Sequence, residues 1–345
     1  FAGDGQLIWD ISRVPDRDRT NLEFPYLMRF KGHWYCSFRE GDRHGNHPSG
    51  RARVIKSEDG KTWETATLLE WQGGDIRDPR MSVTPDGELM LNTSIYFIGE
   101  QRKNPAEWEQ PGKRQSVTWL SKDGENWTGP HVCPTGFATW RWDVAWHQND
   151  GYSVGYSGKD RNGTLYRTRD GKNWEALVED FFPRGGGTEA SLTFGKDGAA
   201  YCLLRGGSFY GRFGIAAAPP YKDWKWHPLL IDAARNGERE PGSEYGRRTG
   251  SIVGGQKLLT LSDGRIVAAT AKGGVSLFWV DPETAEFTRF VHMSDGVSYP
   301  GLVEYDGQFW VTCSQRAVPG KGVKSGVYLI RITVPRKTTL QSLIA

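Results

Sequence analysis

The chain has 345 residues, and its 44 Lys and Arg against 41 Asp and Glu give a formal net charge of +3. Charge near balance, without a run of one sign, argues against a surface that follows nucleic-acid phosphates. No apolar run approaches the roughly 18 to 20 residues of a membrane span. The 44 Gly and 15 Trp against 4 Met favour a chain of many turns and packed aromatics, hence an all-β protein.

In chain order, six segments share one pattern, a strand, a turn with glycine and a second strand: 24–38, 80–94, 143–157, 190–204, 256–270 and 301–315. The glycines taken as turn residues are Gly32, Gly87, Gly151, Gly198, Gly264 and Gly307. Apolar residues alternate or run continuously on either side of each turn, which is typical of buried hairpins. We therefore predict a six-bladed β-propeller formed by residues 1–345 as one domain, with a short tail from about 335.

The ends of the chain have a predicted role in closing this propeller. The N-terminal segment QLIWDIS or the C-terminal segment GVYLIRITV is expected to complete the last blade. The sequence begins at Phe1 without a leader pattern, so we expect a chain whose export signal has been removed, and a secreted or periplasmic location.

A shorter repeat follows three of the hairpins: SEDGKTW at 57–63, SKDGENW at 121–127 and TRDGKNW at 168–174. A degenerate copy, PPYKDWKW, follows the fourth hairpin at 219–226. A hydroxyl and a carboxylate can hydrogen-bond across a tight turn, glycine permits positive φ, and tryptophan covers the base of the hairpin. We interpret Asp59, Asp123 and Asp170 as turn residues rather than as catalytic or calcium-binding groups.

Cysteine and histidine usage gives no metal motif. The four cysteines, Cys36, Cys133, Cys202 and Cys313, are far apart in sequence, and three lie in apolar strand-like segments. We expect free, buried thiols. We predict no cofactor and no metal.

Polar residues recur where the first strand of each hairpin begins and where the second strand ends. In a propeller these positions converge on one mouth of the axial funnel, so we predict a site there. The sequence places at this mouth Glu23, Arg39, Glu40, Asp75, Arg77, Asp78, Arg141, Asp143, Glu189, Arg205, Arg247, Arg248, Gln256, Lys272, Tyr299, Gln315 and Arg316.

The three repeats of aspartate, glycine and tryptophan, the six hairpins and the pairing of Glu189 with Arg205 resemble bacterial sialidases and the wider sialidase-like propellers. The resemblance extends over about residues 21–332. It implies that Tyr299 is a nucleophile polarised by Glu189, and that Arg205 holds a substrate carboxylate. The structural alternative is an ion pair of Glu189 and Arg205 within one blade.

The resemblance has two departures. Sialidases usually begin the first hairpin with Arg-Ile-Pro, where this chain has Glu23-Phe24-Pro25. Their acid is an aspartate in the loop before the first repeat, where this chain offers Asp42 with His44 and His47. The segments FREGDRH, IRDPRMSV and VSYPGLV are similar instead to a divergent bacterial branch of sialidase-like proteins.

The leading functional hypothesis is an exo-acting glycoside hydrolase that releases a terminal acidic sugar, sialic acid first, from a glycan. Tyr299 and Glu189 would provide the nucleophile and its base, with His44 or Asp78 as the acid. A retaining outcome is favoured. Trp140 and Trp142 would stack on sugar faces. The predicted substrate-binding residues are Arg39, Glu40, Arg77, Arg205, Arg248 and Gln256.

Two alternatives use the same scaffold. One is a glycosidase or polysaccharide lyase directed at uronates, in which the arginines neutralise the uronate carboxylate. The other is a carbohydrate-binding propeller without catalysis. The expected partner is a glycan; no nucleic acid and no membrane span are expected, and the sequence does not define an oligomeric state.

Overall fold

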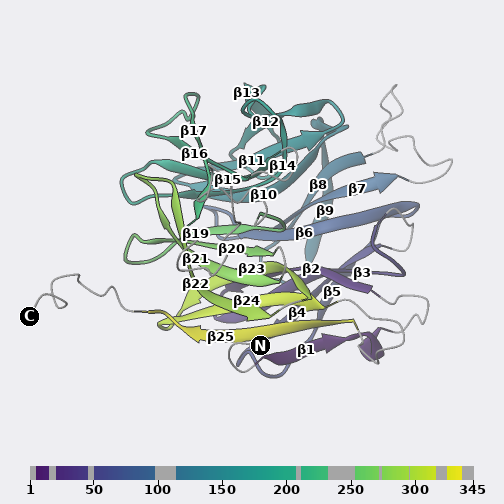
Figure 1. Ribbon diagram of the computed structural model, residues 1–345. Helices are drawn as coiled ribbons and strands as arrows, with labels where there is room; N and C mark the ends of the chain where they lie inside the picture. Colours follow the sequence, from purple (N-terminus) through teal and green to yellow (C-terminus); the bar gives the residue numbers. More distant parts are fainter. Residues whose placement is uncertain are drawn as a thin grey trace, which may run out of the picture.

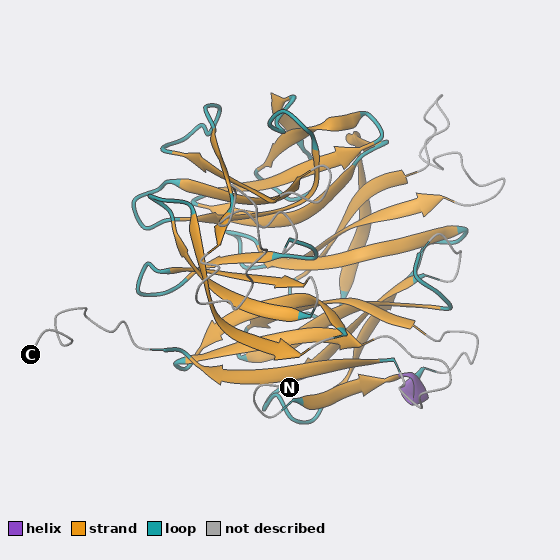
Figure 2. Cartoon of the chain, in the orientation of Figure 1, coloured by secondary structure: helices purple, strands orange, loops and turns teal. Residues whose placement is uncertain are grey.

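The computed structural model describes residues 5–14, 21–45, 50–97, 114–206, 211–231, 253–271, 274–294, 296–315 and 325–335. The regular structure in these ranges is almost entirely strand, arranged as six sheets around one axis (Figure 1). A 3-10 turn, η1 (Ile11–Arg13), appears near the N-terminus in Figure 2. The predicted all-β, six-bladed propeller is confirmed.

The first four blades are meanders whose strands pair in chain order, and the fifth and sixth blades each add one further strand to such a meander. The first three blades are β2 (Asn21–Phe30), β3 (His33–Gly41), β4 (Arg51–Ser57) and β5 (Glu64–Leu69); β6 (Gly74–Val83), β7 (Leu89–Phe97), β8 (Arg114–Ser121) and β9 (Trp127–Phe137); and β10 (Trp140–His147), β11 (Asp150–Ser157), β12 (Asp160–Thr168) and β13 (Glu175–Glu179).

The fourth blade is β14 (Gly187–Phe194), β15 (Ala200–Gly206), β16 (Gly211–Ala216) and β17 (Lys225–Pro228). The fifth is β19 (Lys257–Thr260), β20 (Ile266–Ala271), β21 (Val275–Asp281) and β22 (Glu286–Ser294), and β18 (Leu230–Ile231) adds a parallel strand beside β22. The sixth is β23 (Val297–Tyr305), β24 (Gln308–Gln315), β25 (Gly326–Thr333) and β1 (Gln6–Asp10).

All six predicted hairpins form, each from the first two strands of a blade. The assignment of Gly151 as a turn residue is wrong. Gly151 lies within β11 opposite Trp146, and the turn residue with positive φ is Gln148, at 54°. A larger residue at position 151 would crowd its neighbour, because a Cβ there would lie 3.0 Å from the Trp146 ring.

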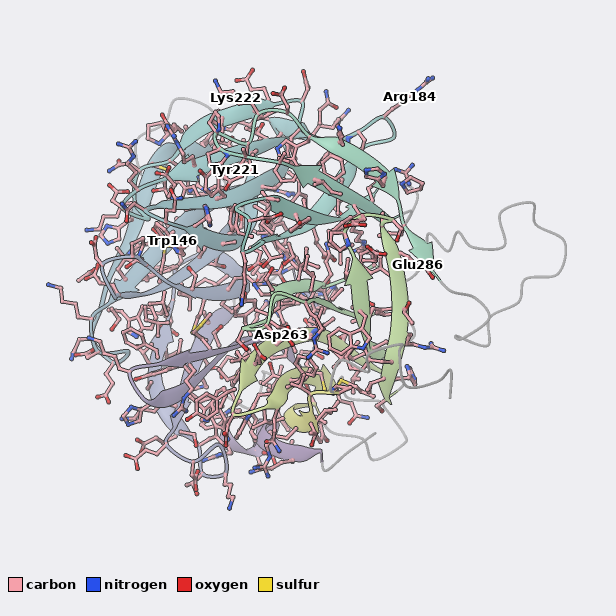
Figure 3. The ribbon with its side chains drawn as sticks, turned by 90° about the vertical axis from the view of Figure 1, so that its left-hand side faces the viewer. Trp146, Arg184, Tyr221, Lys222, Asp263 and Glu286 are labelled. Carbon is pink, nitrogen blue, oxygen red and sulfur yellow. The ribbon has the colours of Figure 1, made fainter. Side chains whose placement is uncertain are left out.

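The first strands of the blades form the inner ring. Successive contacts link β2, β6, β10, β14, β19 and β23, and β23 returns to β2. In Figure 3, Asp263 in the turn of the fifth hairpin lies near the centre of the view, whereas Arg184 and Lys222 lie at the rim. The apolar core fills the spaces between adjacent blades; one cluster, for example, packs Trp142 of blade three against Leu192 of blade four.

Both ends of the chain complete the last blade. β25 pairs with β24, and β1 then pairs antiparallel with β25, so one sheet holds strands from both termini. The sequence predicted one or the other; the structure uses both. The predicted tail, 336–345, lies outside the described residues.

The repeated aspartate turns have one hydrogen-bond pattern. In the first, Asp59 Oδ1 accepts from the backbone N–H groups of Lys61 and Thr62, and Gly60 N donates to Ser57 Oγ. The Trp63 indole N–H donates to the Gly60 carbonyl at 3.2 Å. The degenerate fourth copy keeps the last feature: the Trp224 indole donates to the carbonyl of Tyr221, which has φ 56° in the place of glycine.

The four cysteines are free and buried, as predicted. Within the described ranges, no helix has the length and apolar character to cross a membrane.

Candidate functional site at the axial mouth

A register shift recurs near the start of the first strand in five of the six blades. The pairing of the first strand shifts register near its start in blades one, two and six, at Phe24, Asp78 and Tyr299. Each of these residues precedes a proline and has positive φ, at 59°, 47° and 56°. Such a backbone is rare for residues other than glycine, and β-bulges redirect side chains next to functional sites. The Phe24 and Tyr299 rings meet edge to face, 4.5 Å apart.

Tyr299, Glu189 and Arg205 form one contact group from blades six and four. The Tyr299 hydroxyl donates to Glu189 Oε1 at 3.3 Å, and Arg205 Nη1 lies 3.2 Å from Glu189 Oε2. Glu189 is 5% exposed and also accepts the backbone N–H of Gly255 at 2.9 Å. A carboxylate with these donors is held in a fixed orientation beside the phenol.

Gly255 is the small residue that lets this group assemble. Its φ is 57°, and a Cβ on it would lie 2.6 Å from Tyr299 Cδ1. Any side chain would therefore collide with the phenol ring while occupying strained backbone. The neighbouring Gln256 is fully buried, and its amide donates to the carbonyls of Glu189 and Leu203.

The phenol of Tyr299 is hard to ionise alone. Burial raises its pKa well above the ordinary value, and the charges of Glu189 and Asp78 raise it further, opposed by Arg205 and Arg77. Attack by this oxygen therefore requires that a base accept the proton during the step, and Glu189 is in contact with it.

Asp78 is a buried carboxyl group with a raised pKa. It is 3% exposed, and burial raises its pKa to about 6, with Arg77 and Arg80 lowering it and Glu189 raising it. Its Oδ2 accepts from the Trp142 indole at 3.2 Å. Within the described chain Oδ1 has no hydrogen-bond partner. These properties suit a general acid.

Blade one contributes a buried charge network. Arg39 Nε contacts Asp75 Oδ1 at 2.7 Å, and Arg39 Nη1 lies 3.6 Å from Glu23 Oε2. Gly50 closes over this pair: a Cβ there would lie 1.7 Å from Asp75 Oδ1. Arg39 has no exposed surface, so it supports the mouth without facing it.

His44 extends this network to the surface. Its Nδ1 lies 2.8 Å from Glu23 Oε1, and its side chain is 46% exposed. The ring also packs against Phe24, with centroids 5.5 Å apart. A carboxylate on one ring nitrogen fixes the orientation of the imidazole.

Arg77 is enclosed by aromatic rings. Its guanidinium carbon lies 5.3 Å from the Phe24 ring centre and 5.2 Å from that of Trp140, and its Nη1 is 4.0 Å from Asp75 Oδ2. The loop after β3 passes close by, since a Cβ on Gly45 would lie 2.1 Å from Arg77 Nη1.

Four of the predicted ligand-contacting residues, Arg39, Glu40, Trp142 and Gln256, have no exposed surface, which contradicts a direct contact with a sugar. Glu40 is fully buried and accepts from both Nε and Nη2 of Arg53, so its carboxylate is committed to a pair inside blade one. Trp142 has no exposed surface and holds Asp78, so it cannot stack on a sugar. Arg248 lies outside the described residues.

The structure brings in residues that the sequence reasoning did not select. Phe24 packs on Tyr299, and Gly255 contacts both Tyr299 and Glu189. Tyr156 stacks on Trp140 at 5.5 Å, and burial, then Glu189 and Asp78, raise its pKa well above the usual value. Tyr156 is at the end of the second strand of blade three, so the exit-position rule that selected Arg39 and Arg205 applies to it also.

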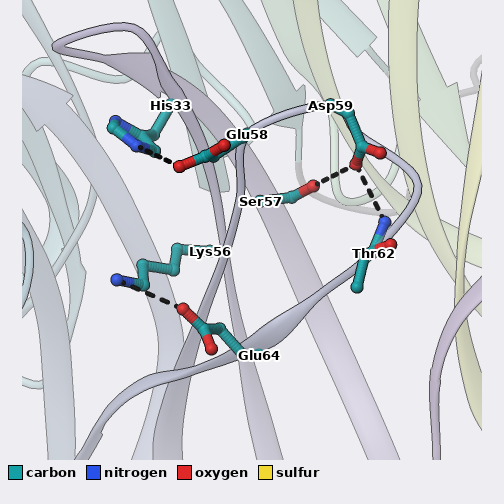
Figure 4. Close-up of a pocket in the computed structure, with 7 residues that line it drawn as sticks. All are labelled: His33, Lys56, Ser57, Glu58, Asp59, Thr62 and Glu64. Carbon is teal, nitrogen blue, oxygen red and sulfur yellow. Dashed lines mark hydrogen bonds and ion pairs between the residues drawn. The ribbon is translucent and has the colours of Figure 1, made fainter.

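A separate surface pocket of about 330 Å³ lies on blade one, away from this mouth (Figure 4). It is lined by His33, Lys56, Ser57, Glu58, Asp59, Thr62 and Glu64. Its charged groups pair with one another, His33 with Glu58 at 3.6 Å and Lys56 with Glu64 at 3.2 Å. The turn N–H groups of Thr62 and Lys61 lower the pKa of Asp59, so its carboxylate belongs to the turn.

Among the described residues, no cluster of three or more His, Cys, Asp or Glu has the arrangement of a metal site. The described side chains of the axial mouth supply a phenol, carboxyl groups, an imidazole and guanidinium groups.

Comparison with known proteins gives the fold. No family model matches the sequence, and no curated protein matches it. A protein of unknown function from Dyadobacter fermentans has 18% identity and a TM-score of 0.71, with 95% of this chain and 98% of that one covered.

Two glycosidases have the same fold. The α-L-arabinofuranosidase of Fusarium graminearum, in complex with an iminosugar inhibitor, has 13% identity and a TM-score of 0.67 over 96% of this chain and 97% of its own. The NanB sialidase of Streptococcus pneumoniae has 13% identity and a TM-score of 0.63, with 95% of this chain and 70% of the sialidase chain covered. The chain thus has the sialidase-like propeller fold.

Proposed function

We propose that this protein is a glycoside hydrolase that removes a terminal sugar at the axial mouth. One observation carries the proposal: the phenol of Tyr299 contacts the buried carboxylate of Glu189, which forms an ion pair with Arg205. The carboxyl group of Asp78, whose pKa is raised to about 6, lies close enough to act on this phenol electrostatically. This combination provides a nucleophile, its base and an acid. The solved glycosidases of the same fold support the class of reaction.

The proposed reaction has two steps. Tyr299 Oη attacks the anomeric carbon while its proton moves to Glu189, and Asp78 protonates the departing glycosidic oxygen. The aglycone leaves with that proton, and the sugar is held through its anomeric carbon on Tyr299 Oη, as an aryl glycoside. Water then adds to the anomeric carbon, its proton returns to Asp78, and Glu189 returns the first proton to Tyr299. The sugar is released with retained configuration.

His44 is the alternative acid. Its exposed ring is anchored by Glu23 and packs on Phe24, next to Tyr299. The pH dependence of activity in variants of Asp78 and His44 distinguishes the two residues.

The sequence predicts an acidic sugar, sialic acid first, bound through Arg39, Arg77, Arg205 and Arg248. Arg205 has a 29% exposed side chain and Arg77 an 11% exposed one, so both can meet a ligand. This identity stays a prediction, as do the uronate-directed alternatives.

The experiment is a hydrolysis screen with aryl glycosides of neutral and acidic sugars, followed by NMR of the first-formed anomer. We expect turnover with retention, lost in Glu189→Gln. Tyr305→Phe, which changes an exposed tyrosine elsewhere in blade six, is the control. Binding of sugars without turnover would replace this proposal with a carbohydrate-binding role, and an unsaturated product would indicate a lyase.

A further inference from the structure

Arg80 is a buried cation next to the acid of the proposed site. It is 2% exposed, and only Pro79 separates it from Asp78 in β6. Its guanidinium carbon lies 3.6 Å from the centre of the Trp142 ring and 5.1 Å from that of Tyr26. Stacking on these rings fixes the planar guanidinium group.

The ring on which Arg80 stacks is also the hydrogen-bond donor to Asp78. The Trp142 indole N–H donates to Asp78 Oδ2 at 3.2 Å, and Trp142 has no exposed surface. The backbone of Trp142 is held as well. Its carbonyl accepts from the Asn92 amide at 2.9 Å, and Asn92 is paired with Arg80 across β6 and β7. One indole thus connects the cation with the carboxyl group.

The positive charge of Arg80 is buried and must be compensated. Its Nε and Nη1, and Oδ1 of Asp78, have no hydrogen-bond partner within the described ranges. A guanidinium does not lose its proton in a protein, so its burial is costly unless an anion lies near. Asp143 interacts with Arg80 but already contacts Lys257 Nζ at 3.0 Å and the Ser191 hydroxyl at 2.7 Å. The charge of Arg80 therefore remains able to stabilise an ionised Asp78.

The electrostatic environment of Asp78 contains cations, an anion and neutral phenols. Burial raises its pKa to about 6, and the neighbouring arginines and the Trp142 hydrogen bond lower it. The two phenols that face it stay neutral near this pH, because burial raises the pKa of each well above the usual value. The charged and titratable groups around it in the described structure are Arg77, Arg80, Glu189, Tyr156 and Tyr299.

We propose that Arg80 is a positioning residue for the acid: it holds the Trp142 indole against Asp78 and compensates the negative charge that Asp78 acquires when its proton leaves. The inference rests on the proposed function for the use of that proton by the glycosidic oxygen. The coupling between Arg80 and Asp78 exists with or without a substrate. Arg80 acts through Asp78 and not on the sugar, because its side chain is buried.

The pH profile of Arg80→Met tests this role. The variant removes the charge and keeps a long side chain, so the ionised form of Asp78 loses stabilisation. We expect the alkaline limb of kcat/KM to move from about pH 6 to higher pH, by about one unit. Arg80→Lys keeps the charge and should keep the limb near pH 6. A role in packing alone would lower activity or stability without moving the limb, and an unmoved limb in folded Arg80→Met would overturn the proposal.

A second measurement is independent of activity. The side-chain carboxyl carbons of ¹³C-labelled aspartate report the titration of Asp78 by NMR, and Asp78→Asn identifies its signal. We expect a midpoint near pH 6 in the wild type and a midpoint about one pH unit higher in Arg80→Met. A shifted midpoint without cleavage of any glycoside would sustain the coupling and defeat the hydrolase. Cleavage with an unshifted midpoint would sustain the hydrolase and defeat this inference.

Arg29→Met is the matched control. Arg29 also stacks on aromatic rings, 5.0 Å from the centre of Trp34 and 4.1 Å from that of Tyr305, and its Nη1 also lacks a hydrogen-bond partner in the described structure. It lies near the hairpin turn of β2, at the end opposite to the mouth, so its removal should leave the midpoint of Asp78 unchanged.

Two further variants keep the test decisive if Arg80→Met does not fold. Arg80→Gln is also neutral and should raise the midpoint of Asp78 in the same way. Trp142→Phe keeps a ring for Arg80 but loses the N–H that donates to Asp78, so the midpoint should again rise. A midpoint that stays near pH 6 in folded Arg80→Gln or Trp142→Phe would overturn the proposal.

Discussion

The chemistry of Tyr299 depends on one neighbour. Its hydroxyl donates to Glu189 at 3.3 Å, and burial holds its pKa well above the usual value. A phenol in this setting cannot act as a standing phenolate, so attack and proton transfer must occur together. Gly255 makes the contact possible because any side chain there would collide with the ring.

Tyr299→Phe tests this role. The variant keeps the ring that packs on Phe24 but loses the attacking oxygen, so we expect kcat/KM to fall by several orders of magnitude with the melting temperature nearly unchanged. If water attacks directly, the same change removes a hydrogen bond and costs about tenfold. An inverted first product, or a fall of only tenfold, would exclude Tyr299 as the nucleophile.

Asp78 gives a pH signature in activity. As the acid it must be protonated, and its pKa is raised to about 6 by burial. We therefore expect kcat/KM to decrease as pH rises above about 6. Asp78→Asn should lose most of the activity and this limb of the profile. A normal alkaline limb in Asp78→Asn, with the limb lost in His44→Gln instead, would transfer the acid role to His44.

The raised pKa of Asp78 also makes the free energy of unfolding depend on pH, in the opposite direction to a carboxylate whose pKa is lowered by an ion pair. Its pKa is raised in the folded state, so stability is highest below the unfolded value near 4 and declines as pH rises towards 6. At pH 7 the ionised group costs up to about 3 kcal/mol. Asp78→Asn should be more stable than the wild type at pH 7 and similar near pH 4, as measured by urea unfolding. Equal stability at both pH values would contradict the raised pKa.

At the scale of elements, the repeated aspartate turns are structural units. Asp170 Oδ1 accepts from the N–H groups of Lys172 and Asn173, and Oδ2 accepts from the Asn173 amide. The Trp174 indole donates to the Gly171 carbonyl, and its buried ring belongs to a core cluster formed by side chains of blades two and three. The turn therefore connects the third and fourth strands of blade three and places its tryptophan ring in the core.

Asp170→Ala should lower the free energy of unfolding by about 1 to 2 kcal/mol, because two backbone N–H groups lose their acceptor. kcat should not change, since the turn contributes nothing to the mouth. Lys172→Ala, in the same turn, keeps those bonds and is the control. Activity lost in Asp170→Ala at unchanged stability would give the aspartate a functional role.

The hairpins could be predicted because their signals are local: strand-length apolar runs around a turn. The sequence pattern failed at Gly151, since the pair Asn149-Asp150 before it places the turn earlier and Gln148 takes positive φ. The two segments that close the last blade could be identified from the sequence, but their pairing could not. The pairing of β1 with β25 joins residues more than 300 positions apart, which no local pattern indicates.

The site was predictable in position but only partly in detail. Topology alone brings Glu189, Arg205 and Tyr299 to one mouth. Side-chain direction is set by bulges, and the three pre-proline residues with positive φ are not evident from residue type. Burial decides which charges face a ligand, and this is why Glu40 and Trp142, chosen by sequence position, lie within the packed structure.

At the scale of the whole molecule, the propeller is a ring that the chain must close. β1 is hydrogen-bonded to β25 of blade six, while its Trp9 packs on Phe38 of blade one, 6.2 Å between ring centres. Trp9 is 4% exposed and belongs to a core cluster that includes Trp34, Ile55 and Trp310 from both blades. One short strand thus connects the first blade with the last.

Trp9→Ala should therefore weaken the closure of the ring more than its place near the end of the chain suggests. Removal of a buried indole from a packed core costs about 3 to 5 kcal/mol, and we expect the free energy of unfolding to fall by that amount. Leu7→Ala on the same strand is the control: Leu7 is 44% exposed, so its loss should cost less than about 0.5 kcal/mol. Both variants should keep the wild-type kcat at 25 °C, because the mouth is built from the inner strands. Equal, small losses in urea unfolding of the two variants would show that β1 is an appendage and that the ring is closed by β25 alone.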